Sequence, residues 1–192
     1  MFILDWIFKA LNYLGLYGKR ARILLLGLDN AGKSTLLHVL KYGRVITPQP
    51  TSLEVHSRLT LGTLRIDAVD LGGHQSMRQV WREHFVAASA VVFVVDAADH
   101  DRFSEAREEL HALLAENVLS NIPFVILGNK IDLSKAVSEH NLKHELGVSL
   151  MCTGKSKSHQ LQEGVRPFEV FMCSVVERTG YADAFRWLSH YV

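Results

Sequence analysis

The run G-L-D-N-A-G-K-S at residues 27–34 constrains this chain more than any other part of its sequence. It matches G-x-x-x-x-G-K-[ST] at every fixed position, and it separates a strand-like apolar run (22–28) from a helical pattern (33–42). Glycines let such a loop wrap closely around phosphates, while backbone N–H groups and the helix N-terminus supply donors and positive potential. An ordinary strand-to-helix turn with a capping serine is the alternative, and the strand–loop–helix context favours a phosphate-binding loop.

This loop assigns roles to individual residues. Lys33 is expected to reach the β- and γ-phosphates, and Ser34 to ligate Mg²⁺. Residues of the loop and of the first helical turn that we expect to contact the nucleotide are Asp29, Asn30, Ala31, Gly32, Lys33, Ser34 and Thr35. Thr51 follows a proline-containing loop and is a candidate second Mg²⁺ ligand that engages only when a γ-phosphate is present. A lone loop threonine is more often a capping residue, so this role depends on the other motifs.

A second motif, D-L-G-G-H, follows an alternating apolar segment at residues 70–74. Asp70 at the end of a strand can hold Mg²⁺ through water, as a Walker-B aspartate does. Gly72 leaves room for a backbone N–H to approach the γ-phosphate, and Gly73 is predicted to lie against the nucleotide as well. His74 is the best candidate for orienting an attacking water, against the alternative of an ordinary loop histidine.

The third motif, N-K-I-D at residues 129–132, follows a buried run and points to guanine. Asp132 offers two acceptor oxygens that match the guanine N1–H and N2 amino group, which adenine lacks. Asn129 is predicted to contact the nucleotide, and the stem of Lys130 can lie along the base plane. A solvated turn is the alternative for so short a motif. The presence of the phosphate-loop motif in the same chain favours base recognition.

A fourth segment, C-S-V at residues 173–175, ends the last predicted strand. Backbone N–H groups of Ser174, Val175 and Val176 could bind the guanine O6. Cys173 is interpreted as a small buried residue rather than a nucleophile.

Apolar runs alternate with helical patterns, which predicts an α/β fold with a mostly parallel sheet covered by helices on both faces. The predicted strands are 22–28, 53–61, 64–71, 90–97, 123–128 and 168–174, with 53–61 and 64–71 joined as a hairpin around Gly62. The predicted helices are 33–42, 102–119 and 182–191. Residues 153–164 are expected to form an exposed insertion or loop. Ligands of such sheets bind beyond the carboxyl ends of the strands, where the four motifs collect.

Composition narrows the function classes. The 192 residues suit one folded domain, and a net charge of +1 gives no basic field for nucleic acid. The two cysteines do not make a disulfide framework and are interpreted as reduced thiols in packing roles. No transmembrane span or signal peptide is predicted, Phe2 excludes N-myristoylation, and the C-terminal residues offer no cysteine for prenylation.

The N-terminal residues 1–18 form a separate predicted unit before a domain at 19–192. Large apolar side chains recur there at helical spacing on one face: Phe2, Ile3, Trp6, Ile7, Leu11 and Leu14. Such a face fits a helix lying in a membrane interface, and the cations Lys19, Arg20 and Arg22 could meet anionic headgroups. A helix docked permanently on the domain is the alternative, and the two are compatible if they belong to different nucleotide states.

The four motifs, G-L-D-N-A-G-K-S, D-L-G-G-H, N-K-I-D and C-S-V, resemble those of the Arf/Sar family of small GTPases. Histidine after D-L-G-G, the aromatic N-terminus F-I-L-D-W-I-F and the C-terminal runs F-M-C-S-V and F-R-W-L-S resemble its Sar branch. The chain departs from that branch at residues 52–56, at Gln75 and around 151–162. These departures bear on partner contacts and leave the nucleotide residues unchanged.

The resemblance implies a six-stranded small-GTPase fold and a switch that hydrolyses GTP to GDP. Sar proteins in the GTP form insert their N-terminal helix into the endoplasmic reticulum membrane and recruit the inner COPII coat for transport to the Golgi. An exchange factor resident in the endoplasmic reticulum loads GTP, and the recruited coat subunit accelerates hydrolysis by contributing an arginine. The expected location is therefore the cytoplasm and the surfaces of the endoplasmic reticulum and transport vesicles.

Hydrolysis is expected to be slow without that partner, because no arginine within the motifs is an evident catalytic finger. Three other interpretations stay open. An Arf-like GTPase of another membrane would share the chemistry and differ in partners. A scaffold that binds nucleotide without turnover is opposed by the complete phosphate and metal motifs, and an ATP-dependent kinase is opposed by Asp132.

Overall fold

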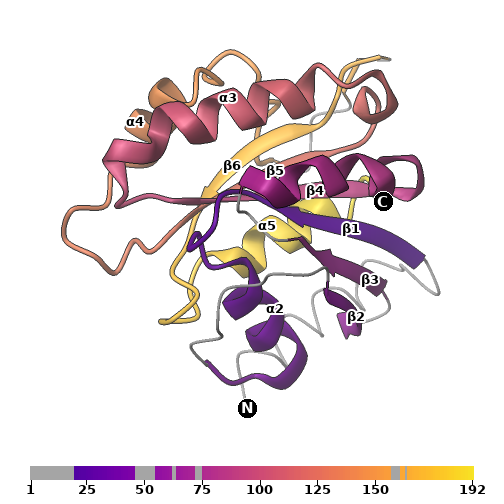
Figure 1. Cartoon of the computed structure of the whole chain (residues 1–192), viewed down its shortest axis with the longest axis horizontal. Coiled ribbons are helices and arrows are strands. Elements are labelled where there is room, and N and C mark those ends of the chain that lie inside the picture. The colour runs from indigo at the N-terminus through magenta and orange to yellow at the C-terminus, as the bar shows by residue number, and fades with distance from the viewer. Residues whose placement is uncertain (1–19, 46–54, 62–63, 72–74, 157–160, 163) are drawn as a thin grey trace.

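The structure is a computed structural model that describes residues 20–45, 55–61, 64–71, 75–156, 161–162 and 164–192. Six strands form one sheet in the order β2-β3-β1-β4-β5-β6 (Figure 1). They are β1 (Arg20–Leu26), β2 (Val55–Leu61), β3 (Leu64–Asp70), β4 (Ala90–Asp96), β5 (Phe124–Asn129) and β6 (Phe168–Met172). Only the pairing of β2 with β3 is antiparallel among these strands. The predicted six-stranded, mostly parallel sheet is confirmed.

The burial of the strands explains their composition. Every residue of β5 and all but the last of β4 are buried, because helices cover both faces of the sheet there. The edge strand β2 alternates instead: Ser57 and Leu59 are buried, whereas His56, Arg58 and Thr60 are exposed. Charged and polar side chains on an exposed edge strand discourage pairing with another chain.

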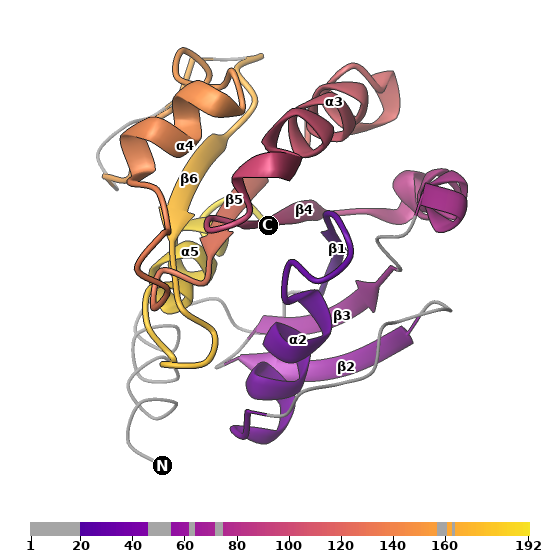
Figure 2. The same ribbon diagram turned by 60° about the vertical axis from the view of Figure 1, so that its left-hand side comes forward.

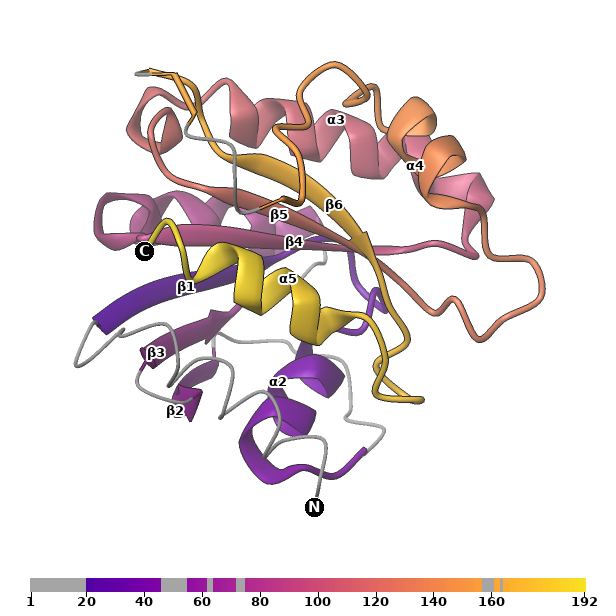
Figure 3. The ribbon, with the colours of Figure 1, turned by 180° about the vertical axis from the view of Figure 1, so that it is seen from behind.

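Helices cover the two faces of the sheet as separate layers (Figure 2). On one face lie α2 (Lys33–Tyr42) and α5 (Tyr181–Leu188), side by side in Figure 3. Their apolar side chains, including Leu36 and Phe185, pack with Leu25 of the sheet in one core cluster. On the other face, α3 (Phe103–Leu114) and α4 (Glu139–Glu145) contribute to a second cluster together with η1 (Gln75–Ala87). None of the helices among the described residues is long and apolar enough to cross a membrane.

The predicted helix at 102–119 is wrong in its second half. α3 ends at Leu114, Glu116 is extended, and a short 3-10 turn, η3 (Asn117–Leu119), follows. At about 100° per residue, a continuous helix would carry position 119 to the side opposite Leu110. Both leucines are fully buried in the same cluster, so the helix has to stop for Leu119 to reach it.

Three further elements were not predicted: η1, η2 (His100–Arg102) and α4. The seven residues of α4 bury one side chain, Leu142, so they show no apolar repeat. The hydroxyl of Ser138 accepts a hydrogen bond from the backbone N–H of Asn141 at 3.3 Å and caps this helix. Other bounds shift by one to three residues: β1 covers Arg20–Leu26 rather than 22–28, and α5 covers Tyr181–Leu188 rather than 182–191.

The segment predicted as an exposed loop, 153–164, is anchored at its start. The N–H of Thr153 donates to the carbonyl oxygen of Phe168 at 2.8 Å, and the indole of Trp187 donates to the carbonyl oxygen of Gly154 at 2.9 Å. Thr153 and Gly154 are therefore half-buried, while the described residues 155–156, 162 and 164 are exposed as expected. Within those parts of the segment that are described, no helix or strand forms.

Candidate nucleotide-binding site

The predicted motifs meet at the carboxyl edge of the parallel strands. The phosphate loop follows β1, Asp70 ends β3, and Asn129 ends β5. Cα pairing places Leu25 beside Asp70 and Asp96 beside Asn129, so the two strands of each pair end at the same level. This is the edge at which ligands of open α/β sheets bind.

The phosphate loop has a backbone that its glycines permit. Gly32 is in the left-handed region, with φ of 101°, and directly precedes α2. A Cβ there would collide with the side-chain amide of Asn129, and one at Gly27 would collide with the carbonyl oxygen of Val94. The loop is thus packed directly onto the ends of β4 and β5, and neither glycine position has room for a side chain.

The side chain of Lys33 is hydrogen-bonded to the backbone of this loop. This side chain is buried, and Nζ donates to the carbonyl oxygens of Gly27 at 2.9 Å and Leu28 at 2.8 Å. A buried ammonium is tolerated because such acceptors replace water. The charge is therefore held at the loop where phosphate oxygens would bind.

Ser34 and Asp70 form the candidate metal site. Oγ of Ser34 donates to Oδ2 of Asp70 at 2.6 Å, and Asp70 is buried. A hydroxyl and a carboxylate are the oxygen donors that Mg²⁺ prefers, and Mg²⁺ in nucleotide sites takes most of its remaining ligands from phosphates and water. The residues present therefore fit Mg²⁺. The other predicted ligand, Thr51, lies outside the described residues, as do Gly72, Gly73 and His74.

At the end of the site that is predicted to bind the base, side chains join the loops that follow β5 and β6. Oγ of Ser174 donates to Oδ1 of Asp132 at 2.6 Å and itself accepts from the N–H of Glu177 at 3.0 Å. Nζ of Lys130 lies 2.6 Å from Oδ2 of Asp96, which draws the lysine stem over the end of β4. The Lys130 backbone has φ of 68°, a left-handed conformation that turns the chain sharply after β5. Val175 is buried and Val176 is exposed, both directly after this junction.

Asn129 connects the two ends of the site. Its side-chain Nδ2 donates to the carbonyl oxygen of Ala31 at 2.9 Å, and its Oδ1 accepts from the N–H of Val175 at 3.1 Å. The side chain is 3% exposed. These hydrogen bonds make Asn129 a brace between the phosphate loop and the loop that follows β6, and its contact with the nucleotide stays a prediction.

Cys173 packs beneath this brace. Burial raises the pKa of its thiol to about 12, and the thiol donates weakly to Oδ1 of Asn129. Both cysteines are free thiols, and burial also raises the pKa of Cys152, to about 11. At neutral pH both are protonated, which agrees with packing roles rather than nucleophilic ones.

Sequence reasoning missed two charged residues at this edge, Asp96 and Arg102. Asp96 pairs with Lys130, and Arg102 forms a 2.8 Å ion pair with Asp29 of the phosphate loop. Asp96 ends β4 and Arg102 ends the short turn η2 that follows it, and ligands of such sheets bind beyond the carboxyl ends of the strands. That position is the only signal the sequence carries, since neither residue belongs to a motif.

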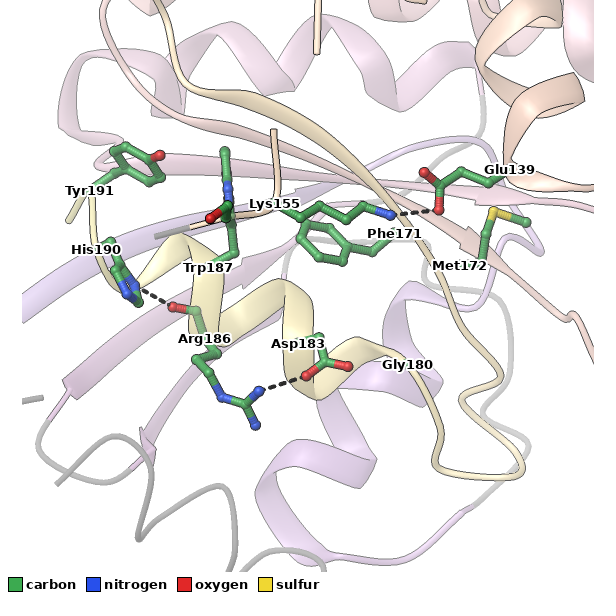
Figure 4. Close-up of a pocket in the computed structure, with 11 residues that line it drawn as sticks. Glu139, Lys155, Phe171, Met172, Gly180, Asp183, Arg186, Trp187, His190 and Tyr191 are labelled. Atoms are coloured by element: carbon green, nitrogen blue, oxygen red, sulfur yellow. Dashed lines mark hydrogen bonds and ion pairs between the residues drawn. The ribbon is translucent and has the colours of Figure 1, made fainter. Parts of the chain in front are cut away.

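A separate hollow of about 630 Å³ lies between α5, β6 and the start of the 153–164 segment (Figure 4). Trp187 and Phe171 supply aromatic surface, and Lys155 reaches over the ring of Phe171 towards Glu139. None of the described residues that we predicted to bind nucleotide lines it.

Comparisons with known proteins agree on the family. A family model described as "ADP-ribosylation factor family" matches residues 7–192. The chain is 45% identical over 188 residues to a Giardia intestinalis protein named small COPII coat GTPase SAR1, covering 98% of both chains. It is 40% identical over 197 residues to the SAR1 protein of Nicotiana tabacum, covering 100% of both.

The fold is also shared with a solved structure. The Arl6 BBS3 small GTPase of Trypanosoma brucei, determined with the nucleotide analogue GppNp, superposes with a TM-score of 0.77 at 24% identity. The match covers 90% of this chain and 96% of that one. The chain therefore belongs to the ADP-ribosylation factor family of small GTPases, and within it to the Sar branch.

Proposed function

We propose that this chain is a GTP-hydrolysing switch that acts in COPII coat assembly at the endoplasmic reticulum. The observation that carries the nucleotide assignment is the junction of Asp132 with Ser174, 2.6 Å apart, at the same sheet edge as Lys33 and Ser34. Asn129 joins Ala31 of the phosphate loop to Val175, the neighbour of Ser174, and so links the phosphate loop to the loop that contacts the candidate base-reading carboxylate. The names of the SAR1 relatives support the COPII role.

In this proposal each motif has one task. Lys33 and the backbone N–H groups of the loop bind the phosphates, and Asp132 accepts hydrogen bonds from the guanine base. Ser34 and Thr51 would hold Mg²⁺ directly, with Asp70 supporting it. Bound Mg²⁺ supplies neutralising charge at the phosphates. His74 orients the water that attacks the γ-phosphate in line, and a coat subunit provides an arginine worth about 10³–10⁵ in rate.

The membrane part rests on residues 1–18, outside the described residues. We assign this segment to an amphipathic helix that binds the endoplasmic reticulum surface in the GTP form, ahead of a GTPase domain at 19–192. Partners are then the inner coat subunits, including the GTPase activator, and an exchange factor resident in that membrane. The protein would reside in the cytoplasm and on the endoplasmic reticulum and transport vesicles.

The nucleotide assignment is tested by the Asp132→Asn variant. An amide can donate where the carboxylate only accepts, so the variant should lose GTP affinity and gain affinity for xanthosine triphosphate, which carries an oxygen at C2. Binding of GTP, ATP and xanthosine triphosphate is measured by titration with the parent and variant chains. A variant that binds GTP as tightly as the parent would show that Asp132 does not read the base.

The coat assignment needs a separate experiment. Liposomes, the chain with a non-hydrolysable GTP analogue, and purified inner COPII subunits are mixed and floated. Coat subunits should float only with the analogue, and single-turnover GTP hydrolysis should accelerate when they are added. An Arf-like GTPase of another membrane would bind GTP and leave these subunits in solution. No turnover with any activator would instead indicate a nucleotide-binding scaffold.

A further inference from the structure

The phosphate loop, which is proposed to bind anionic phosphates, contains one acidic side chain, that of Asp29. Asp29 lies in the phosphate loop, between Gly27 and the left-handed residue Asn30. Its side chain is 44% exposed, so it is not withdrawn into the core. The hydrogen bond from Arg102 lowers the pKa of Asp29, and the positive charge of Lys33 lowers it further, so the carboxylate is charged at neutral pH. Phosphate groups bound by this loop would meet a negative charge at its rim.

Arg102, which lies in a different element, forms an ion pair with that carboxylate. It ends η2 (His100–Arg102) and directly precedes α3, 73 residues after Asp29. Nη2 donates to Oδ1 of Asp29 at 2.8 Å, and Nη1 donates to the backbone carbonyl oxygen of the same residue at 3.3 Å. The guanidinium therefore holds both the side chain and the main chain of Asp29.

Glu105 fixes the other side of the guanidinium. Nε of Arg102 donates to Oε2 of Glu105, in the first turn of α3, at 2.8 Å. A planar guanidinium with donors on three nitrogens can satisfy all three contacts at once, which a lysine ammonium on a flexible stem cannot do with the same orientation. Burial by itself would lower the pKa of Arg102, but these hydrogen bonds raise it, so its charge is permanent.

We propose that Arg102 is a positioning residue of the phosphate loop: it holds Asp29 away from Lys33 and fixes the loop backbone for phosphate binding. Lys33 and Asp29 lie in the same loop and attract each other, so an Asp29 released by Arg102 competes with phosphate for the ammonium. The bond to the Asp29 carbonyl also fixes the peptide that leads into Asn30. This inference rests on the proposed binding of guanine nucleotide at this loop.

An exposed ion pair alone would contribute little. The difference here is that removal of Arg102 leaves a charged group behind, next to the site of a polyanion. The penalty should grow with the charge of the ligand, so it is larger for GTP than for GDP. A merely structural contact would instead weaken both nucleotides equally and would not respond to the charge of Asp29.

The test measures release of fluorescent GDP and of a fluorescent, non-hydrolysable GTP analogue from the full chain. Arg102→Ala should speed release of the GTP analogue by about tenfold, the size of one hydrogen bond to a charged group, and of GDP by less. Arg102→Lys should release the GTP analogue at a rate between those of Arg102→Ala and the parent chain. Arg102→Ala combined with Asp29→Asn should regain most of the lost retention, because the unpaired charge is gone.

Arg107→Ala is the matched control, since Arg107 lies on the same helix and its guanidinium faces Gly147 rather than the phosphate loop. It should release both nucleotides at the parent rate. Equal acceleration for the two nucleotides, no acceleration in Arg102→Ala, or no recovery in the double variant would each overturn the proposal. A parent chain that retains no guanine nucleotide would instead overturn the proposed function. Thermal unfolding of each variant, recorded alongside, shows whether any change in release follows from loss of the fold.

Discussion

The hydroxyl of Ser174 donates a 2.6 Å hydrogen bond to Oδ1 of Asp132, which fixes the candidate guanine-reading carboxylate from the opposite loop. Ser174 is fully buried and is itself oriented by the N–H of Glu177. The hydroxyl therefore has one acceptor and one donor partner, and its proton is directed at Asp132. This pair links the loops that follow β5 and β6.

Ser174→Ala is expected to weaken GDP binding by about tenfold, because a hydrogen bond to a charged group is lost and the N–H of Glu177 loses its acceptor. Preference for GDP over inosine diphosphate, which lacks the 2-amino group, should fall as well. Competition titrations with the two nucleotides measure both effects. Ser138→Ala removes a serine hydroxyl that caps α4 instead, so it should leave this preference unchanged. An undiminished preference in Ser174→Ala would mean that Asp132 is positioned without it.

Ser34→Asn is expected to favour GDP over GTP. The contact of Ser34 with Asp70 is 2.6 Å, so a longer side chain has no room between the loop and the carboxylate. The triphosphate form depends more on Mg²⁺, and disturbing such a ligand pair costs roughly tenfold or more in metal affinity. Dissociation constants for GDP and GTP at high and low Mg²⁺ measure this. Unchanged GTP affinity with unchanged dependence on Mg²⁺ would remove Ser34 from the metal site.

The sequence predicts the elements that local patterns determine, and it misses features that depend on contacts between residues far apart in the chain. The bounds of α2 were predicted correctly, since Gly32 and Gly43 flank it in left-handed conformations and its apolar spacing is helical. The strands were found because continuous apolar runs indicate burial on both faces. The end of α3 was not, because it depends on where Leu119 finds space in the core.

The site divides in the same way. Motifs predicted which residues collect at the sheet edge, since a motif is a local pattern. They did not predict that Asn129 joins Ala31 to Val175, or that Arg102 holds Asp29. Those partners are set by the strand order and by the relative positions of loops far apart in the chain, which no local pattern encodes.

A buried carboxylate holds the start of the 153–164 segment, and its removal should destabilise the domain. Glu169 is 2% exposed and accepts from the N–H of Gly154 at 2.8 Å and from Nζ of Lys143 at 3.0 Å. Glu169→Ala leaves a half-buried ammonium with one partner fewer and an amide without its acceptor. A loss of about 3 kcal/mol is expected, which corresponds to roughly 6–12 °C in Tm.

Differential scanning calorimetry with bound GDP measures this change. Asp67→Ala is the matched control, because Asp67 pairs with Arg58 at the surface, and it should change the free energy of unfolding by under about 1 kcal/mol. Adding Lys143→Met to Glu169→Ala should recover part of the loss, since the ammonium is then absent. Equal small effects of Glu169→Ala and Asp67→Ala would show that the buried pair contributes little.

The last prediction concerns how nucleotide controls membrane binding by the N-terminal segment. Its apolar residues Phe2, Ile3, Trp6, Ile7, Leu11 and Leu14 each gain about 1.5–3 kcal/mol on burial, so several together can decide where the segment lies. Thr51 and Gly72, the residues expected to respond to the γ-phosphate, flank the hairpin β2–β3 at the edge of the sheet. A ligand shifts such an equilibrium only by its differential affinity for two states, and these two attachment points supply that difference.

Flotation with liposomes is therefore expected to be strong with a non-hydrolysable GTP analogue and weak with GDP. Trp6→Asp with Ile7→Asp should abolish flotation and leave nucleotide binding intact, whereas Leu150→Asp, at a fully exposed leucine of the domain, should change neither. Equal flotation in both nucleotide states, or flotation that survives the double replacement, would show that this segment is not the switchable anchor.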